Sequence, residues 1–267
     1  MTELETASVV FFLLLASAGV GVFIRPLLPE EHKAFETVQL LKLVIGMLVT
    51  FAALVLGLLT ASAKTLFDTT NNDIRSYATA LIQLDNSLRQ YGPDGDTPRQ
   101  LLRTYTAAAI ASTWAQEPPP PGDYFPKLPA PDPNADHLDS RELGTLLERA
   151  QHEVRELQPR DPYHQKMDNE ALLRFDNLVQ QRWKIVEEAR GSISTPFDRI
   201  LVFWLLVIFL CFGLITPRNA LAFVIITLGA LSIASAVLVI LDLGTPFTGP
   251  IIVPSQPMRD ALSYLSR

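Results

Sequence analysis

The stretch from Val38 to Tyr91 contains no proline, and its character changes once along its length. Its first part, Leu43 to Ala63, carries no charged residue, and a helix of that length is long enough to cross a bilayer. Beyond Lys64, apolar residues recur at alternating steps of three and four, the spacing of a coiled-coil seam. Gly92-Pro93 then ends the run. We therefore predict one continuous helix that leaves the membrane and becomes a packing element of a soluble domain.

The composition limits the class of protein. Of the 267 residues, 48% are hydrophobic and 19% are charged, with a formal net charge of −6. The acidic balance and the absence of a Lys/Arg run argue against a nucleic-acid partner. Cys211 is the single cysteine, so a disulfide framework or a thiolate zinc site within one chain is excluded. We expect no metal and no cofactor.

The hydrophobic residues collect into four charge-free blocks, which predicts an all-α integral membrane protein with four transmembrane helices. Residues 1–63 form a first hairpin, with spans at about 6–24 and 43–63. Residues 198–243 form a second hairpin, with spans at about 200–217 and 220–241. Residues 64–197, inserted between spans two and three, form a soluble helical bundle, and 244–267 form a non-helical tail with a short terminal helix.

Within the soluble part, three heptad-like runs predict a coiled-coil-like bundle of about four helices. A proline-rich loop at 117–136 interrupts it and is either floppy or laid across the bundle. Arg182 falls in an apolar seam, where it either pairs with an acid of a neighbouring helix or faces a functional cavity. In the tail, Gln256 to Leu265 predicts an amphipathic helix with Met258, Ala261, Leu262 and Leu265 inward.

The short connections on the side of the membrane opposite the bundle hold Arg25, Lys33, Lys42 and Arg218, and the residues before the first span include no Lys or Arg, although Lys64, Lys184, Arg190 and Arg199 flank the bundle side. The positive-inside rule counts such short loops and discounts long domains. It places these connections in the cytoplasm and the bundle outside. The expected location is a bacterial inner (plasma) membrane, with the lipid bilayer as the first partner.

Two stretches carry a family resemblance. One is Arg25-Pro-Leu-Leu-Pro-Glu-Glu-His32, and the other runs from Phe212-Gly-Leu-Ile-Thr-Pro-Arg-Asn219 through the fourth span to Thr245-Pro-Phe-Thr-Gly-Pro250 and Met258-Arg-Asp-Ala-Leu262. Together they resemble the bacterial bestrophin-like-domain family, four-span membrane proteins of largely unassigned function. The resemblance implies kinship to the bestrophin chloride channels, which are pentamers with pores lined by the second membrane helix.

No catalytic motif is present, so we expect no enzyme. The resemblance and the second span instead favour an oligomeric membrane ion channel or pore, a homo-oligomer conducting inorganic ions, with the second membrane helix on the axis. The candidate pore-lining residues are Gly46, Thr50, Gly57 and Thr60. The alternative is a non-conducting, membrane-anchored interaction or sensing module that acts through its bundle.

The candidate mouth or gate residues are Glu30, Glu31, His32 and Asp242. The first three either form a proton or ion site or cap and anchor a helix start. Asp242, where the fourth span ends, either repeats around a symmetric mouth or accepts hydrogen bonds from the tail and holds it in place.

Overall fold

A computed structural model describes residues 3–27, 29, 35–127, 140–190, 195–217 and 219–267. In these ranges all regular structure is helical, which agrees with the predicted all-α class. The chain divides into two compact units, one of residues 1–66 with 192–251 and the other of residues 67–191 with 252–267. We refer to them as the apolar unit and the helical unit.

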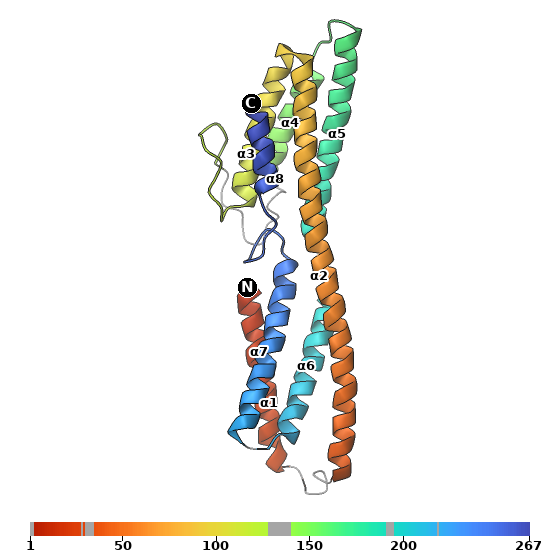
Figure 1. Cartoon of the computed structure of the whole chain (residues 1–267), viewed down its shortest axis with the longest axis vertical. Coiled ribbons are helices and arrows are strands. Elements are labelled where there is room, and N and C mark those ends of the chain that lie inside the picture. Colours follow the sequence, from red (N-terminus) through yellow and green to blue (C-terminus); the bar gives the residue numbers. More distant parts are fainter. Residues whose placement is uncertain (1–2, 28, 30–34, 128–139, 191–194, 218) are drawn as a thin grey trace. The chain divides into compact units, whose positions relative to one another are not determined.

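Helix α2 (Phe35–Tyr91) contributes to both units and is a single uninterrupted helix (Figure 1). This confirms the predicted continuous helix, and its end at Tyr91 agrees with the stop signal at Gly92-Pro93. Gly92 has a φ of 102°, a left-handed conformation that glycine adopts without a Cβ penalty. It therefore allows the chain to turn sharply into α3.

The apolar unit contains α1 (Glu3–Ile24), η1 (Arg25–Leu27), the first part of α2, α6 (Thr195–Ile215) and α7 (Ala220–Leu243). Helix α1 lies against both α6 and α7 (Figure 1). Three helices, α1, α2 and α7, are long and apolar enough to cross a membrane, and the apolar part of α6, Arg199–Ile215, is shorter.

Helices α1 and α6 approach closely because glycines face each other where they meet. A Cβ on Gly21 would collide with the Leu210 backbone carbonyl, and a Cβ on Gly213 would collide with the Ala18 carbonyl. The Ser17 hydroxyl adds a 2.7 Å hydrogen bond to the Leu206 carbonyl of α6. At the other end of this pair, the Arg25 side chain donates to the Thr216 carbonyl.

The helical unit contains the second part of α2, η3 (Pro93–Gly95), α3 (Asp96–Thr113), α4 (Arg141–Arg155), α5 (Pro162–Arg190) and α8 (Gln256–Leu265). The predicted α2 seam is buried at Ile74, Tyr77, Leu81, Leu84, Leu88 and Tyr91. Ser140 caps α4 by accepting from the Leu143 amide at 3.1 Å. The seam of α5 lies partly at other residues than predicted, because Ala171, Leu178 and Ile185 are buried beside Phe175, Arg182 and Val186.

The tail returns to the helical unit through α8, whose bounds and four inward residues are those predicted. The Trp114 indole N–H donates to the Val253 carbonyl at 2.7 Å and fixes the segment before α8. In the described part of the proline-rich loop, Arg259 donates to Glu117 at 3.0 Å and to the Pro118 carbonyl at 2.8 Å. The beginning of this loop is therefore laid on α8, and residues 128–136 lie outside the described part.

Candidate functional site

The four candidate pore residues occupy one exposed face of α2. Gly46, Thr50, Gly57 and Thr60 are all exposed in the isolated chain. Steps of three, four, seven and eleven residues return to nearly the same side of an α-helix, so these residues align along its length. Apart from the surrounding backbone of α2 itself, no described atom lies within 4 Å of a Cβ position built on Gly46 or Gly57. The result is a smooth longitudinal strip of small and hydroxyl residues, which we call the α2 strip.

A different face of α2 packs inside the apolar unit. Its buried residues are Ile45, Ala52, Leu59 and Ala63. At the border of this packed face, the half-exposed Phe51 lies beside Trp204 of α6, with ring centroids 6.2 Å apart. Among the described residues, this packing therefore uses a face of α2 other than the strip.

A third face of α2 exposes large apolar side chains, namely Met47, Phe51, Leu54 and Leu58, each about half exposed or more. Apolar side chains exposed over such a length mark a surface covered by lipid or by another protein. The strip is the part of the α2 circumference that combines exposure with small or hydroxyl side chains.

The sequence analysis missed two residues that belong with the strip. Ala53 and Lys64 are exposed and share its helical phase with Gly46 and Gly57. The signal was present in the spacing, since Lys64 lies one full helical repeat of eighteen residues beyond Gly46. The strip therefore ends in a positive charge.

The threonines of the strip bond to their own helix. The Thr50 hydroxyl donates to the Gly46 carbonyl at 2.9 Å, and the Thr60 hydroxyl donates to the Leu56 carbonyl at 2.7 Å. Each hydroxyl proton is thereby directed at the backbone, while the oxygen lone pairs stay available on the exposed side. The strip thus exposes hydrogen-bond acceptors without leaving a buried group unsatisfied.

Asp242 lies apart from the strip, buried at the end of α7 within the apolar unit. One carboxylate oxygen accepts from the Ile251 amide at 3.0 Å. Glu3 accepts from the hydroxyls of Thr245 and Thr248 at 3.2 and 3.4 Å. The Ile251 contact is the kind of hydrogen bond that a tail anchor would make, while the Thr245 and Thr248 hydroxyls bond to Glu3 rather than to Asp242. Glu30, Glu31 and His32 lie outside the described residues.

Gly249 shows how closely the tail wraps Asp242. Its φ is 87°, and a Cβ built there would collide with the Asp242 carboxylate. A side chain at this position would be strained both by its backbone conformation and by the contact. Among the described residues no group of three or more His, Cys, Asp or Glu side chains is arranged to hold a metal ion.

In the helical unit, Arg182 sits in the core against two tyrosines. The Tyr77 and Tyr105 hydroxyls are 2.6 Å apart, and Tyr105 also hydrogen-bonds with Arg182. Burial raises the pKa of both tyrosines, so both stay neutral: one hydroxyl can donate to the other, and the Tyr105 oxygen can accept from the guanidinium. Arg182 is 5% exposed, so it belongs to the core rather than to the groove described next.

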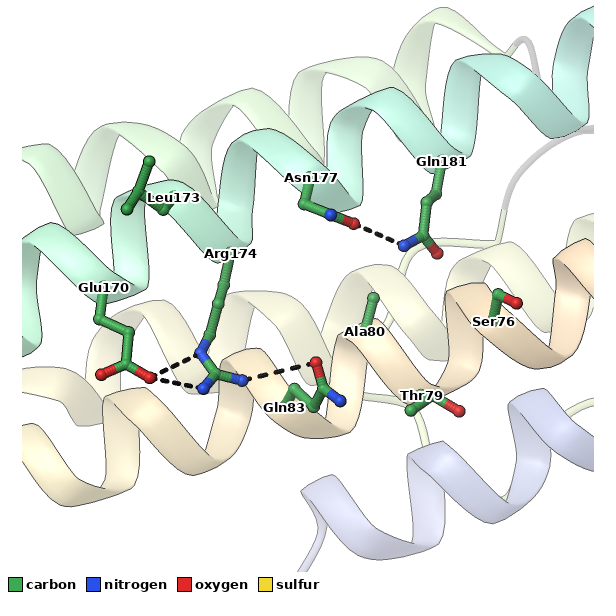
Figure 2. A pocket seen from close by; sticks show the side chains of 9 residues that line it. All are labelled: Ser76, Thr79, Ala80, Gln83, Glu170, Leu173, Arg174, Asn177 and Gln181. Atoms are coloured by element: carbon green, nitrogen blue, oxygen red, sulfur yellow. Dashed lines mark hydrogen bonds and ion pairs between the residues drawn. The ribbon is translucent and has the colours of Figure 1, made fainter.

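A polar groove of about 520 Å³ runs between α2 and α5 (Figure 2). Arg174 donates to Glu170 of its own helix at 3.1 Å. It also donates to the Gln83 amide oxygen of α2 at 3.5 Å. Further along, Gln181 and Asn177 of α5 hydrogen-bond each other beside Ser76 and Ala80 of α2 (Figure 2). Neither the groove nor its residues were anticipated, because a groove depends on the register of two helices far apart in the sequence.

These features define a class: a helical membrane protein whose second apolar helix leaves the lipid-exposed region without a break and carries an exposed strip of small and hydroxyl residues. The chain belongs to the Bestrophin-like domain family, whose model matches residues 10–258. The predicted family resemblance is confirmed.

Solved structures agree on the fold. A mutant of a bacterial bestrophin homologue from Klebsiella pneumoniae aligns with a TM-score of 0.66 at 15% identity, covering 98% of this chain and 100% of that one. Another structure of a bacterial bestrophin homologue from the same organism aligns at 0.61 and 13% identity, covering 95% and 96% of the two chains. At such identities the likeness establishes the fold. No curated protein matches the chain.

Proposed function

We propose that identical copies of this chain assemble in the inner membrane of a bacterium into a ring that conducts inorganic ions, with the α2 strip lining the shared axis. The observation that carries the proposal is the strip itself: small and hydroxyl residues exposed over the apolar length of α2, on a face that the described residues leave uncovered. Kinship to the bestrophin chloride channels favours the same reading.

A single chain is too small to enclose a pathway, so the proposal requires closed symmetry. In a ring, the exposed apolar face of α2 would meet lipid or a neighbouring copy, and the strip would meet its own equivalents across the axis. Water and ions would then contact threonine oxygens and glycine backbone between walls that are mainly apolar. Lys64 would lie at the end of the strip in every copy.

The proposed topology has four spans, with α6 as the third and the helical unit between the second and third. The apolar part of α6 is at the lower limit for crossing a bilayer, about 17 residues. We place the helical unit outside the cytoplasm, following the distribution of Lys and Arg. Single cysteines at Asp123 and Asn219, with Cys211 replaced by Ser, test this arrangement. We expect an impermeant thiol reagent to label position 123 on intact cells and position 219 after lysis; the reverse pattern would invert the topology.

The alternative is a non-conducting module that binds an envelope partner through its helical unit. The polar groove between α2 and α5 favours it, since the groove offers donors and acceptors from both helices (Figure 2). The two functions differ in stoichiometry and in current. A ring with an axial cavity supports a channel, whereas a monomer or a two-fold dimer without current supports the module.

The decisive experiment measures current and assembly on matched threonine variants. Purified protein in planar bilayers should conduct, and Thr50→Val should change unitary conductance or ion preference because it removes the strip's oxygen while keeping side-chain shape. Thr227→Val is the control, because Thr227 is partly exposed and likewise donates to its own helix, at 2.9 Å, but lies on α7. Equal effects of both variants, or no current from an intact oligomer, would contradict the pore.

A further inference from the structure

Beyond the groove, α2 and α5 meet at a charged contact whose position follows from their register. Gln83 faces Arg174, and Asp73 faces Lys184, with the Lys184 ammonium 2.8 Å from one Asp73 oxygen. Ten residues separate the two contacts on each helix, in opposite directions. The helices are therefore antiparallel at constant register, and the Asp73 contact lies beyond the Ser76–Gln181 end of the groove (Figure 2).

This contact contains two carboxylates and one ammonium. The Lys184 ammonium also lies 3.8 Å from one oxygen of Glu188, one turn further along α5. The Glu188 carboxyl is within hydrogen-bonding reach of Asp73. Asp73 and Lys184 are the charged groups that act on Glu188, one from each of the two helices. With both acids ionised, the cluster carries one uncompensated negative charge.

The second oxygen of each carboxyl group, Asp73 Oδ2 and Glu188 Oε2, indicates how this excess charge is neutralised. Asp73 Oδ2 and Glu188 Oε2 are both buried, and no hydrogen-bond donor among the described residues reaches either one. A buried acceptor without a donor is costly, and two ionised carboxylates side by side repel each other. One proton between the two carboxyl groups satisfies both oxygens and removes the excess charge at once.

We propose that Asp73 of α2 and Glu188 of α5 share a single proton and that its loss loosens the contact between the two helices, which makes this contact a proton-controlled switch. Burial, followed by the neighbouring Asp73 carboxylate, raises the pKa of Glu188 from 4.5 to about 7. Lys184 opposes this rise, and the hydrogen bond with Asp73 in turn raises the pKa of Lys184. The switch stands independently of the proposed conduction, because it concerns the packing of two helices in the helical unit.

The direction of the pH effect follows from the raised pKa. An acid that holds its proton more tightly in the folded chain than in the unfolded one contributes stability below pH 4.5, and this contribution is lost as the pH rises to about 7. Above that pH the contact should be loosest. Glu188→Gln keeps the shape of the neutral acid and can donate to Asp73, so the variant should behave as the permanently protonated form.

The test is infrared titration of the purified full-length protein in detergent, read at the carbonyl stretch of protonated carboxyl groups. Wild type should lose a band with a midpoint near 7 that is missing from Glu188→Gln. Glu187→Gln, which changes the exposed neighbouring acid, should titrate like wild type. Lys184→Gln should move the midpoint upward, because it removes the charge that favours the ionised form.

Hydrogen exchange shows whether loss of the shared proton also loosens the helix contact. Hydrogen exchange of the last turns of α5, corrected for its intrinsic pH dependence, should accelerate at least severalfold between pH 6 and 8 in wild type and in Glu187→Gln. It should stay nearly constant in Glu188→Gln. The proposal is overturned if no carboxyl band titrates above pH 6, or if Glu188→Gln keeps the wild-type pH dependence of exchange. Both outcomes can be read whether or not the protein conducts.

Discussion

The two units hold their helices together by opposite means. In the apolar unit, α1 and α6 meet where Gly21 and Gly213 leave no room for a Cβ. In the helical unit, the contacts are made by large side chains such as Tyr77, Phe175 and Trp114, all essentially fully buried. In lipid, burying a large apolar side chain yields little, because the lipid is equally apolar, so close backbone approach and dispersion contacts carry the association. In water the same burial is the main driving force.

The largest effect should come from deleting the biggest side chain of the helical unit. Trp114→Ala removes a buried indole and its bond to the Val253 carbonyl, and should lower the free energy of unfolding by about 3–5 kcal/mol. Trp183→Ala is the matched control, since Trp183 is half exposed on α5. Thermal unfolding of both variants in detergent measures the difference. If both variants lost the same free energy of unfolding, burial of large side chains would not be what holds the helical unit together.

A proline in α2 tests whether stability and assembly depend on the continuity of this helix. Ala61→Pro removes a backbone hydrogen bond in the exposed part of α2 and should cost about 3 kcal/mol or more, with loss of assembly. Ala61→Ser at the same exposed position is the control and should be close to neutral. Retention of full thermal stability and assembly by the proline variant would show that the helix need not be continuous.

In the apolar unit, adding one methyl group at the contact between α1 and α6 should be enough to destabilise the fold. Gly213→Ala places a Cβ against the Ala18 carbonyl, and either helix must shift, which costs about 1–3 kcal/mol. Gly19→Ala is the control. Gly19 lies on α1 next to Ala18, but no neighbouring side chain or helix lies within 4 Å of its Cβ position, so stability should be unchanged or slightly raised. Comparison of their melting temperatures decides the point. A neutral Gly213→Ala would contradict close packing as the basis of this unit.

The smallest effect is expected at Asp242. Asp242→Asn keeps the shape and one acceptor, so the bond to the Ile251 amide weakens rather than disappears, at a cost of about 1 kcal/mol. If the residue serves as a tail anchor, proteolysis of the 244–251 segment should increase while ion preference stays fixed. A change of ion preference in an intact oligomer would instead support the mouth ring.

The sequence was most informative where one helix carries its own pattern. The seam of α2 from Ile74 to Tyr91 and the inward face of α8 were predictable because apolar residues repeat at helical spacing. The strip on α2 was partly predictable, since glycine and threonine stand out in an apolar run, whereas Ala53 and Lys64 do not until the helical phase is followed. In α5, two apolar residues often stand side by side; the heptad spacing predicts Leu172 and Val179 in the seam, whereas their neighbours Ala171 and Leu178 are the buried residues.

What escaped prediction depends on pairs of helices. The Gly21–Gly213 contact joins residues from opposite ends of the chain, and nothing in either sequence neighbourhood marks its partner. The Asp73–Lys184–Glu188 cluster likewise requires the antiparallel register of α2 and α5. Asp242 was recognised as an acid in need of a partner because it closes a helix, but its partner Ile251 follows from a turn whose geometry Gly249 makes possible.

The uninterrupted α2 also constrains how this chain can change in evolution. A loop absorbs an inserted residue, but a helix converts it into a rotation of about 100°. One residue added between Thr60 and Asp73 would turn the strip away from its direction relative to every contact that α2 makes with α5. Two turns, or roughly seven residues, would nearly restore it. Length variation among relatives in this segment should therefore come in steps of about seven, while the proline-rich loop can vary freely.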